Sequence, residues 1–333
     1  MKYLVTGAAG FVGSKLSETL CNQGHEVVAT DNLSGYYSKD LKEKRLQHFI
    51  VKNGIKFELG DLADLEFVSK VVRSHKPDFV IHLAAQPGIR LSINESSRYR
   101  DDNLVAFMNI CEATRLSEIP NFLYASSSSV YGNLECEIYS ESESRIQPIS
   151  IYGATKLANE IIANAFVRNS STKALGMRFF TVYGPWGRPD MAYFRLIASA
   201  LNGDPFKLLG DGTVRRDFTF IDDIVEMICK LADHLTTKSK GFSDVVNIGG
   251  GSPRSMTELI SEIEKQTTQP INMTLGDANS GDTRFTCADV TKLRSMTNSA
   301  PSIGLDLGIE KCLSWAMQEG IKENLRNWTN SVN

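Results

Sequence analysis

Apolar residues in the first half of the chain follow two alternating patterns. Short continuous apolar runs indicate strands that are buried on both faces. Between them lie longer segments with apolar residues three or four apart, which is typical of amphipathic helices. The predicted strands lie in "KYLVTG", "EVVATD", "IKFELGD", "PDFVIHLAA", "NFLYAS" and "KALGMRF", and most are followed by a helical pattern such as "FVGSKLSETLCNQG".

Strands that alternate with helices imply crossover connections and a parallel sheet with helices on both faces. The alternation ends near residue 180, where prolines and glycines become frequent. We therefore predict an α/β protein, with a Rossmann-like doubly wound parallel sheet and a smaller C-terminal substrate-binding lobe. The expected domains are residues 1–178 and 179–333, interleaved so that segments such as 215–248 return to the first domain.

The composition is ordinary for a globular protein, with 333 residues, 42% of them hydrophobic and 23% charged. A net charge of −3 gives no electrostatic reason to expect nucleic acid or an anionic membrane as a partner. No apolar run approaches the ~18 residues that span a bilayer. The chain opens directly with a predicted strand, so we expect no signal peptide. The charged run "KDLKEKR" is interpreted as the solvated face of a helix.

Six cysteines are scattered along the chain without a Cys-x-x-Cys spacing. We interpret them as reduced and structural, which favours a reducing compartment, the cytoplasm. Cysteines and histidines show no metal-ligand spacing, so we expect no metal site. His82 is interpreted as a packed strand residue.

Three glycines, Gly7, Gly10 and Gly13, lie between the first predicted strand and the first predicted helix. Glycines there allow a tight turn and close approach to a pyrophosphate, and the helix start offers free N–H groups to phosphate. The alternative is a tight turn without a ligand. The position directly after the first strand favours a dinucleotide site, although the spacing is G-x-x-G-x-x-G rather than the common G-x-G-x-x-G.

Two carboxylates end the next two predicted strands. Asp31, eighteen residues after Gly13, can accept hydrogen bonds from the adenosine ribose and would repel a 2′-phosphate. No arginine follows to receive that phosphate, so the expected cofactor is NAD rather than NADP. Asp61 can bind the adenine amino group, or it can be a helix N-cap.

The stretch "YASSSSVYG" ends an apolar run with four serines. A serine-rich tract can be a flexible linker. The alternative is a wall of hydroxyls at the carboxyl end of a strand, where open α/β sheets bind ligands. The apolar flanks on both sides favour the second interpretation.

Tyr152 and Lys156, in "YGATK", lie four residues apart and therefore on one face of a predicted helix. A free phenol ionises near pH ~10, so a tyrosine base needs ~4 kcal/mol of phenolate stabilisation to work near neutral pH. The ammonium of Lys156 and a positive nicotinamide ring together are expected to supply it. An isolated pair of this spacing is commonly an ordinary helix pair, but the nucleotide turn and the hydroxyl-rich strand end favour catalysis.

These motifs make the chain resemble the extended short-chain dehydrogenase/reductase family, in particular its nucleotide-sugar epimerases and dehydratases. The resemblance covers nearly the whole chain. It rests on "TGAAGFVGSKL", "DLAD", "HLAAQ", "SSSSVYG", "YGATK", "RFFTVYGP" and "RRDFTFIDDIV". The match is strongest to the UDP-glucuronate 4-epimerases, through "DNLSGYYSKDLKEKRL", "AAQPGIRLS" and "RFFTVYGPWGRPDMAYF".

The resemblance implies that Ser127 is the catalytic hydroxyl, which holds the sugar 4-hydroxyl beside Tyr152. Related dehydratases carry an Asp-Glu pair, and related decarboxylases a Glu, where this chain has Ser128 and Ser129. Without an acid or base beside the catalytic hydroxyl, elimination lacks its proton donor and acceptor. The serine row therefore favours an epimerase.

Further residues are expected to bind the substrate. Arg90 and Arg188 follow predicted strand ends and can meet anionic groups, because guanidinium groups match carboxylates and phosphates; each can also be a loop-bracing arginine. The resemblance implies that Arg216 binds the nucleotide diphosphate and that Asp282 lies near the nucleotide ribose. This chain differs from galactose 4-epimerases at two positions. It has Asn279 where they have an Arg, and Thr181 where they have an Asn.

The expected function is NAD-dependent 4-epimerisation of a UDP-sugar, in particular UDP-glucuronate to UDP-galacturonate, through a 4-keto intermediate. The first domain is then the NAD-binding domain and the second binds the nucleotide sugar. The alternatives are a 4-epimerase of neutral or N-acetylated UDP-hexoses, and a non-catalytic NAD-binding regulator. The resemblance also implies a homodimer.

Overall fold

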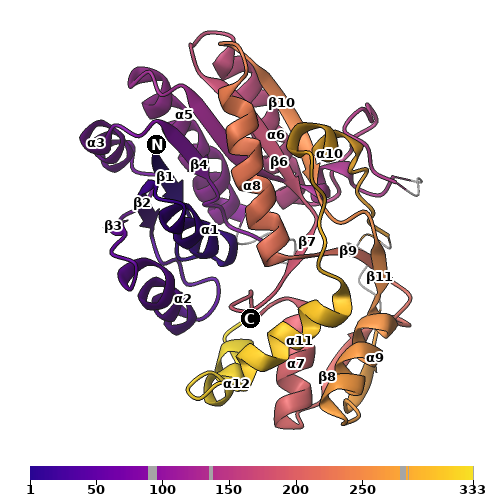
Figure 1. Cartoon of the computed structure of the whole chain (residues 1–333). Helices are drawn as coiled ribbons and strands as arrows, with labels where there is room; N and C mark the ends of the chain where they lie inside the picture. Colours follow the sequence, from indigo (N-terminus) through magenta and orange to yellow (C-terminus); the bar gives the residue numbers. More distant parts are fainter. Residues whose placement is uncertain (89–95, 135–137, 278–282, 284, 333) are drawn as a thin grey trace.

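A seven-stranded sheet forms the centre of the protein, which we describe from a computed structural model (Figure 1). The structure describes residues 1–88, 96–134, 138–277, 283 and 285–332. The strand order is β10-β6-β5-β4-β1-β2-β3, and all of these strands pair in parallel. The strands are β1 (Lys2–Thr6), β2 (Glu26–Asp31), β3 (Lys56–Leu59), β4 (Phe79–His82), β5 (Asn121–Ser127), β6 (Lys173–Phe179) and β10 (Ser243–Ile248).

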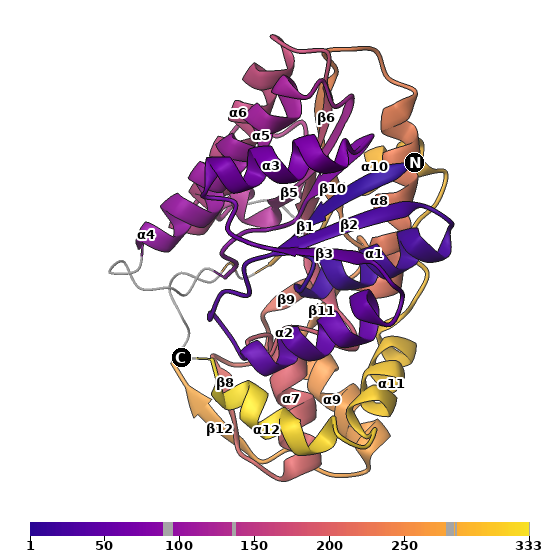
Figure 2. The ribbon, with the colours of Figure 1, turned by 90° about the vertical axis from the view of Figure 1, so that its left-hand side faces the viewer.

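Helices cover both faces of this sheet, so the predicted Rossmann-like doubly wound fold is confirmed (Figure 2). One face carries α3, α5 and α6, and the other carries α1 and α8. The helices of this part are α1 (Phe11–Asn22), α2 (Lys39–Arg45), α3 (Leu65–His75), α4 (Ser96–Tyr99), α5 (Ala106–Leu116), α6 (Ile151–Val167) and α8 (Ile221–Thr236). Two further turns are π-helical, η1 (Leu46–Val51) and η3 (Arg100–Val105).

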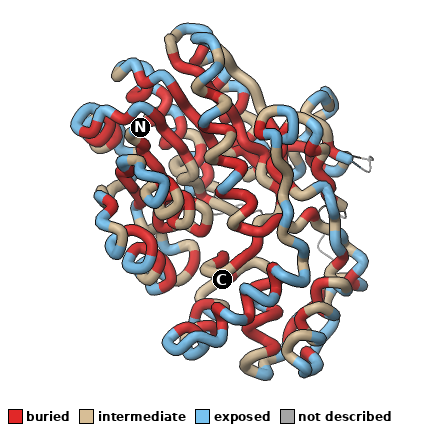
Figure 3. Tube along the Cα trace, in the orientation of Figure 1, coloured by how far each residue is buried: buried red, intermediate tan, exposed pale blue. Residues whose placement is uncertain are grey.

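The central strands are buried on both faces, as their continuous apolar runs predict (Figure 3). All four residues of β4 are buried, including His82, whose Nδ1 lies 2.9 Å from Thr6 Oγ1. Burial lowers the pKa of His82 to about 3, so it is a neutral, packed strand residue as expected.

A smaller group of elements lies below the carboxyl ends of the large sheet (Figure 1). It contains a three-stranded sheet of order β11-β9-β7 and a parallel pair, β12-β8. The strands are β7 (Thr181–Tyr183), β8 (Phe206–Leu209), β9 (Arg215–Phe220), β11 (Pro253–Ser255) and β12 (Met273–Gly276). The helices of the C-terminal half are α7 (Ala192–Asn202), α9 (Met256–Thr267), α10 (Thr291–Thr297), α11 (Leu305–Ala316) and α12 (Lys322–Asn330).

The chain returns to the large sheet after leaving it. α8 packs against α1, and β10 then adds to the edge of the sheet beside β6. The division into residues 1–178 and 179–333, with interleaved segments such as 215–248, stays a prediction. No described helix is long and apolar enough to cross a membrane.

The charged run in α2 differs from its interpretation as a solvated face. Lys42 and Arg45 are buried, and Arg45 is 0% exposed. The segment therefore contributes buried cations to the interior, and only residues such as Lys39 and Asp40 face solvent.

Candidate active site

A cavity of about 760 Å³ lies between the carboxyl ends of the large sheet and the smaller lobe. β1 is followed by β2 and β3 on one side, whereas β4 pairs on its other side. Open α/β sheets bind ligands in the crevice at such a reversal of strand order. The cavity is lined by predicted site residues of every kind: Gly7, Gly10, Gly13, Asp31, Asp61, Ser127, Ser128, Ser129, Tyr152, Lys156, Thr181, Arg188 and Arg216. Arg90, Asp282 and Asn279 lie outside the described residues.

The glycine positions of the turn between β1 and α1 have no room for side chains. Gly7 has a φ of +70°, and a Cβ there would lie 2.7 Å from the backbone nitrogen of Ala84. A Cβ at Gly13 would lie 2.2 Å from the carbonyl oxygen of Gly7. α1 begins at Phe11 without a side-chain cap, so its first N–H groups remain available to a phosphate.

Asp31 at the end of β2 braces this turn. Its carboxylate accepts hydrogen bonds from Ala9 N at 3.0 Å and Leu33 N at 2.8 Å. A carboxylate has further lone pairs, so Asp31 can also accept from ribose hydroxyls in the cavity it lines. The turn, the free helix start and this acceptor together fit an adenine dinucleotide.

Asp61 is not the cap of the helix that follows it. The N-cap of α3 is Asp64, whose side chain accepts from Glu66 N and Phe67 N. Asp61 instead accepts from Ala63 N at 2.8 Å and from Asn32 Nδ2 at 3.2 Å. The alternative interpretation of Asp61 as the N-cap is therefore wrong, and its carboxylate faces the cavity.

The serine row is a structured strand end, so the linker interpretation is wrong. β5 ends at Ser127, and a 3₁₀ turn, η4 (Ser128–Tyr131), follows directly. The Ser127 hydroxyl accepts from Ser129 N at 3.1 Å, which holds the turn. Ser127, Ser128 and Ser129 line the cavity.

A buried charge network lies behind this row. The buried hydroxyl of Ser126 donates a hydrogen bond to Glu160 of α6. Glu160 also pairs with Arg178 of β6 through two hydrogen bonds of 2.7 and 2.9 Å. The network therefore ties the strand end before Ser127 to the helix that carries Tyr152 and Lys156.

α6 presents Tyr152 and Lys156 to the serine row. Ser150 caps the helix by accepting from Gly153 N. A Cβ at Gly153 would lie 2.5 Å from the carbonyl oxygen of Ser129, so this glycine lets the helix approach the row. Lys156 Nζ donates to the carbonyl of Ala125 at 2.9 Å and lies 5.9 Å from the centre of the Tyr152 ring.

The electrostatics of this pair differ from the sequence-based expectation. Burial raises the pKa of Tyr152. The positive charge of Arg188 and a hydrogen bond with Ser127 oppose that rise, rather than Lys156 as the spacing suggested. Burial also lowers the pKa of Lys156 to about 8, so its ammonium is the main form at neutral pH. The described residues therefore favour the protonated phenol of Tyr152 at neutral pH.

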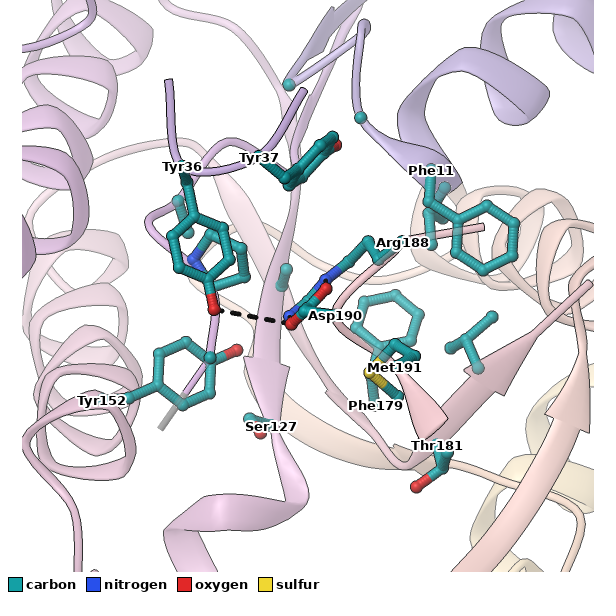
Figure 4. A pocket seen from close by; sticks show the side chains of 18 of the residues that line it. Phe11, Tyr36, Tyr37, Ser127, Tyr152, Phe179, Thr181, Arg188, Asp190 and Met191 are labelled. Atoms are coloured by element: carbon teal, nitrogen blue, oxygen red, sulfur yellow. Dashed lines mark hydrogen bonds and ion pairs between the residues drawn. The ribbon is translucent and has the colours of Figure 1, made fainter. Parts of the chain in front are cut away.

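Arg188 enters the cavity from the loop after β7. It pairs with Asp190 of the same loop, with Nε 3.0 Å from Oδ1 and a second hydrogen bond from Nη2 to Oδ2. The hydroxyl of Tyr36, from the loop after β2, donates to Asp190 Oδ2 at 3.5 Å. Figure 4 shows Tyr36, Tyr152, Ser127 and Arg188 facing the same space.

Arg45 holds this loop from α2. Its guanidinium donates to the carbonyls of Trp186 at 2.9 Å and Gly187 at 2.8 Å. It also donates to the Ala9 carbonyl at 3.2 Å, in the glycine turn. Trp186 has a left-handed φ of 62°, which is costly for a residue with a side chain and is held here by these contacts. Arg45 thus links the glycine turn to the loop that carries Arg188.

Several residues of the site were not singled out from the sequence. Asp190 could have been noticed, because it stands two residues after Arg188 in a proline-stiffened loop. Tyr36 and Arg45 gave no such signal, because their partners lie far away in the chain. Asp102 also lines the cavity, and burial together with the charge of Asp61 raises its pKa to about 6.

Comparison with known proteins identifies close relatives over nearly the whole length. The sequence model of the NAD dependent epimerase/dehydratase family matches residues 3–249. The chain is 38% identical to Protein CapI of Staphylococcus aureus over 331 residues, which covers 96% of this chain and 99% of that protein. It is 34% identical to a probable UDP-glucuronate 4-epimerase of Rhizobium meliloti, covering 95% and 96%.

A solved structure is also similar to this chain over nearly its whole length. The UDP-glucuronic acid 4-epimerase of Bacillus cereus, in complex with UDP-glucuronic acid and NAD, superimposes with a TM-score of 0.87 at 33% identity. The match covers 97% of this chain and 99% of that one.

Proposed function

Because the chain belongs to the NAD-dependent epimerase/dehydratase family, we propose that it is a UDP-sugar 4-epimerase that interconverts UDP-glucuronate and UDP-galacturonate. Its relatives include proteins named as UDP-glucuronate 4-epimerases in bacteria and plants. The observation that carries the proposal is the serine row beside Tyr152 and Lys156 in one cavity. The row offers hydroxyls to the sugar and no acid or base for elimination.

The proposed roles follow from the positions of the side chains. Tyr152 takes the proton of the sugar 4-hydroxyl at its phenolic oxygen, and Ser127 holds that hydroxyl in reach. NAD, when bound, supplies the acceptor and donor for the carbon-4 hydride and a positive ring that favours the phenolate. Lys156, whose ammonium is the main form at neutral pH, adds a positive charge near Tyr152. The cofactor is held by Gly7, Gly10, Gly13, Asp31 and Asp61. The diphosphate of the UDP portion is held by Arg216.

Incubation of the purified protein with UDP-glucuronate tests the function. Proton NMR of the sugar should show UDP-galacturonate appearing until the two epimers reach equilibrium. Conversion of UDP-glucose or UDP-N-acetylglucosamine instead would establish the neutral-sugar alternative. Binding of NAD without conversion of any UDP-sugar would indicate a non-catalytic regulator.

One observation favours the neutral-sugar alternative as a second candidate. Arg188, the cation expected to meet the sugar carboxylate, is already paired with Asp190. The Asp190 carboxylate therefore already occupies part of the Arg188 guanidinium. Comparing UDP-glucuronate with UDP-glucose in the same assay separates the two functions.

Asp31 should make the enzyme prefer NAD to NADP. Its carboxylate would repel a 2′-phosphate and accept from a ribose hydroxyl. Asp31→Ala should narrow the ratio of the two dissociation constants by about tenfold, or ~1.4 kcal/mol. Titration of the protein with each cofactor measures the ratio, and tighter binding of NADP by the unmodified protein would contradict the assignment. Asp31→Asn is the matched control, because it loses the charge but keeps a side-chain acceptor for the glycine turn. A similar change in its ratio assigns the effect to the charge rather than to a disturbed turn.

The hydroxyls of Ser128, Ser129 and Thr181 should protect the intermediate from losing carbon dioxide. Oxidation of UDP-glucuronate at carbon 4 gives a β-keto acid, which decarboxylates when the breaking bond aligns with the carbonyl π system. Neutral hydroxyls can hold the carboxylate out of that alignment without acting as strong acids toward the developing enolate.

Removal of one of these hydroxyls by substitution with alanine should therefore release UDP-4-keto-pentose and raise free NADH. A lost hydrogen bond to a charged group costs about 1.5–3 kcal/mol. At ~1.4 kcal/mol per tenfold, the product ratio should shift about ten- to a hundredfold. Mass spectrometry of the products, with NADH absorbance in parallel, measures the shift. If all three variants lose rate but yield only the 4-epimer, the hydroxyls position the sugar without guarding the carboxylate.

We also propose that the enzyme is a homodimer in the cytoplasm. The neighbouring helices α5 and α6 expose large apolar side chains, Met108 at 56% and Ile161 at 64%, which is typical of a protein interface. The described cysteines are free, which is consistent with a reducing compartment. Light scattering of the purified protein measures its mass in solution.

A further inference from the structure

Arg188 and Asp190 form an ion pair inside the cavity where the sugar is proposed to lie. Two parallel hydrogen bonds join them, from Nε to Oδ1 at 3.0 Å and from Nη2 to Oδ2. Their side chains are only 23% and 13% exposed, so water screens the pair weakly. The two residues are separated by one proline, which restricts the loop between them.

Asp190 is held from a second side as well. Tyr36 donates to it at 3.5 Å from the loop after β2 (Figure 4). Arg45 holds the Arg188 loop through the carbonyls of Trp186 and Gly187. The position of the carboxylate beside the guanidinium is therefore set by three different parts of the chain.

Epimerisation at carbon 4 makes a particular demand on such a site. Hydride must leave one face of carbon 4 and return to the other, so the 4-keto sugar must turn in front of one fixed nicotinamide. The carboxylate on the adjacent carbon moves with the ring. An unpaired guanidinium would form a strong two-pronged pair with that carboxylate, and the sugar would have to break the pair to turn.

We propose that Asp190 is a positioning residue that acts through Arg188: it occupies the guanidinium, so that the cavity accepts the uronate carboxylate without trapping it in one orientation. The inference rests on the proposed function. Arg188 keeps N–H groups beyond the two that face Asp190, since a guanidinium has five donors. Its remaining N–H groups can therefore donate to the uronate carboxylate while Asp190 occupies the other two. The hydroxyls of the serine row can then orient the sugar.

The first test measures binding without chemistry. In a Tyr152→Phe background loaded with NAD, Asp190→Asn should raise the affinity for UDP-glucuronate at least about tenfold, because Arg188 becomes available to the carboxylate. Affinity for UDP-glucose, which lacks the carboxylate, should change less than about twofold. Isothermal titration calorimetry with the two sugars measures the difference.

The second test measures turnover in the otherwise unmodified protein. Asp190→Asn should lower both KM and kcat for UDP-glucuronate, with kcat falling about tenfold or more because the sugar turns slowly. The fraction of enzyme that holds NADH during turnover, followed by absorbance, should rise because the 4-keto sugar accumulates when its rotation is slow. Asp190→Glu keeps the charge and should restore a KM within a few-fold of the unmodified value.

The controls separate charge from folding. Glu143→Gln removes one carboxylate from an ion pair of the same spacing outside the cavity, with the largely exposed Arg145, and should change none of these values. Thermal melting checks that each variant folds, and Asp190→Ser is a second variant that also removes the charge.

Three outcomes would overturn the inference. Weaker binding of UDP-glucuronate by Asp190→Asn would mean that Asp190 only orients Arg188. Equal changes for UDP-glucuronate and UDP-glucose would mean that the pair does not sense the carboxylate. Tighter binding with unchanged kcat would mean that the pair does not limit turning. Absence of UDP-glucuronate turnover by the unmodified protein would instead reject the proposed function, while the binding measurement would still report on Asp190.

Discussion

Tyr152→Phe should abolish epimerisation while leaving NAD binding near its normal strength. The substitution removes only the phenolic oxygen, which is the proposed acceptor of the 4-hydroxyl proton. General acid–base groups contribute about 10²–10⁴-fold to rate. Tyr152 is expected at the upper end of that range, because Ser127, Ser128 and Ser129 offer no alternative base. Product NMR under single-turnover conditions, together with an NAD titration, measures both effects.

Lys156→Ala tests the role of the residue beside Tyr152. Lys156 donates to the Ala125 carbonyl and lies beside Tyr152, so its loss should lower activity and also weaken NAD binding if it holds the nicotinamide ribose. A Tyr152→Phe protein that kept most of its activity would show that another base is at work. Burial raises the pKa of Tyr152, whereas the positive nicotinamide ring of bound NAD should lower it, so a spectroscopic titration of the phenol should show ionisation at lower pH with NAD than without it.

Arg188→Ala should weaken turnover of UDP-glucuronate far more than binding of UDP. The substitution leaves the Asp190 carboxylate in the cavity without its guanidinium, beside the place proposed for the uronate carboxylate. Losing one partner of a buried, hydrogen-bonded charge pair costs about 2–5 kcal/mol. The expected loss in kcat/KM is therefore about 30- to several-thousandfold.

Steady-state kinetics with UDP-glucuronate and calorimetry with UDP separate the two quantities. Similar losses for both would show that Arg188 binds the diphosphate or only braces its loop. Arg188→Lys keeps the charge but not the two-pronged geometry, so it should recover part of the loss.

The serine row shows how far local pattern could predict this site. The apolar run before Ser127, the tyrosine-lysine spacing and the glycine turn each depend on neighbours within one strand or helix turn. Such patterns report where a backbone segment ends and which face a side chain occupies. The parallel order of the strands followed from the same regular alternation, through the rules for crossover connections.

The partners of buried charges could not be predicted in that way. The charged pattern of "KDLKEKR" predicts that Arg45 lies on a solvated helix face, yet it is buried against carbonyls more than 140 residues away in sequence, at Trp186 and Gly187. Its guanidinium makes four hydrogen bonds, to the carbonyls of Trp186, Gly187 and Ala9 and to the hydroxyl of Tyr37, where separate segments of the chain meet. Nothing in the spacing of "KDLKEKR" indicates which cations those segments enclose.

The sequence by itself determined the parallel sheet, the dinucleotide turn and the row of hydroxyls, because each depends on short-range spacing and backbone geometry. Only the tertiary structure decided the charge state of the site. It paired Arg188 with Asp190 and buried Tyr152 so that its pKa rises. Desolvation and ion pairing depend on which distant segments exclude water from a group, and that is settled only when the whole chain packs.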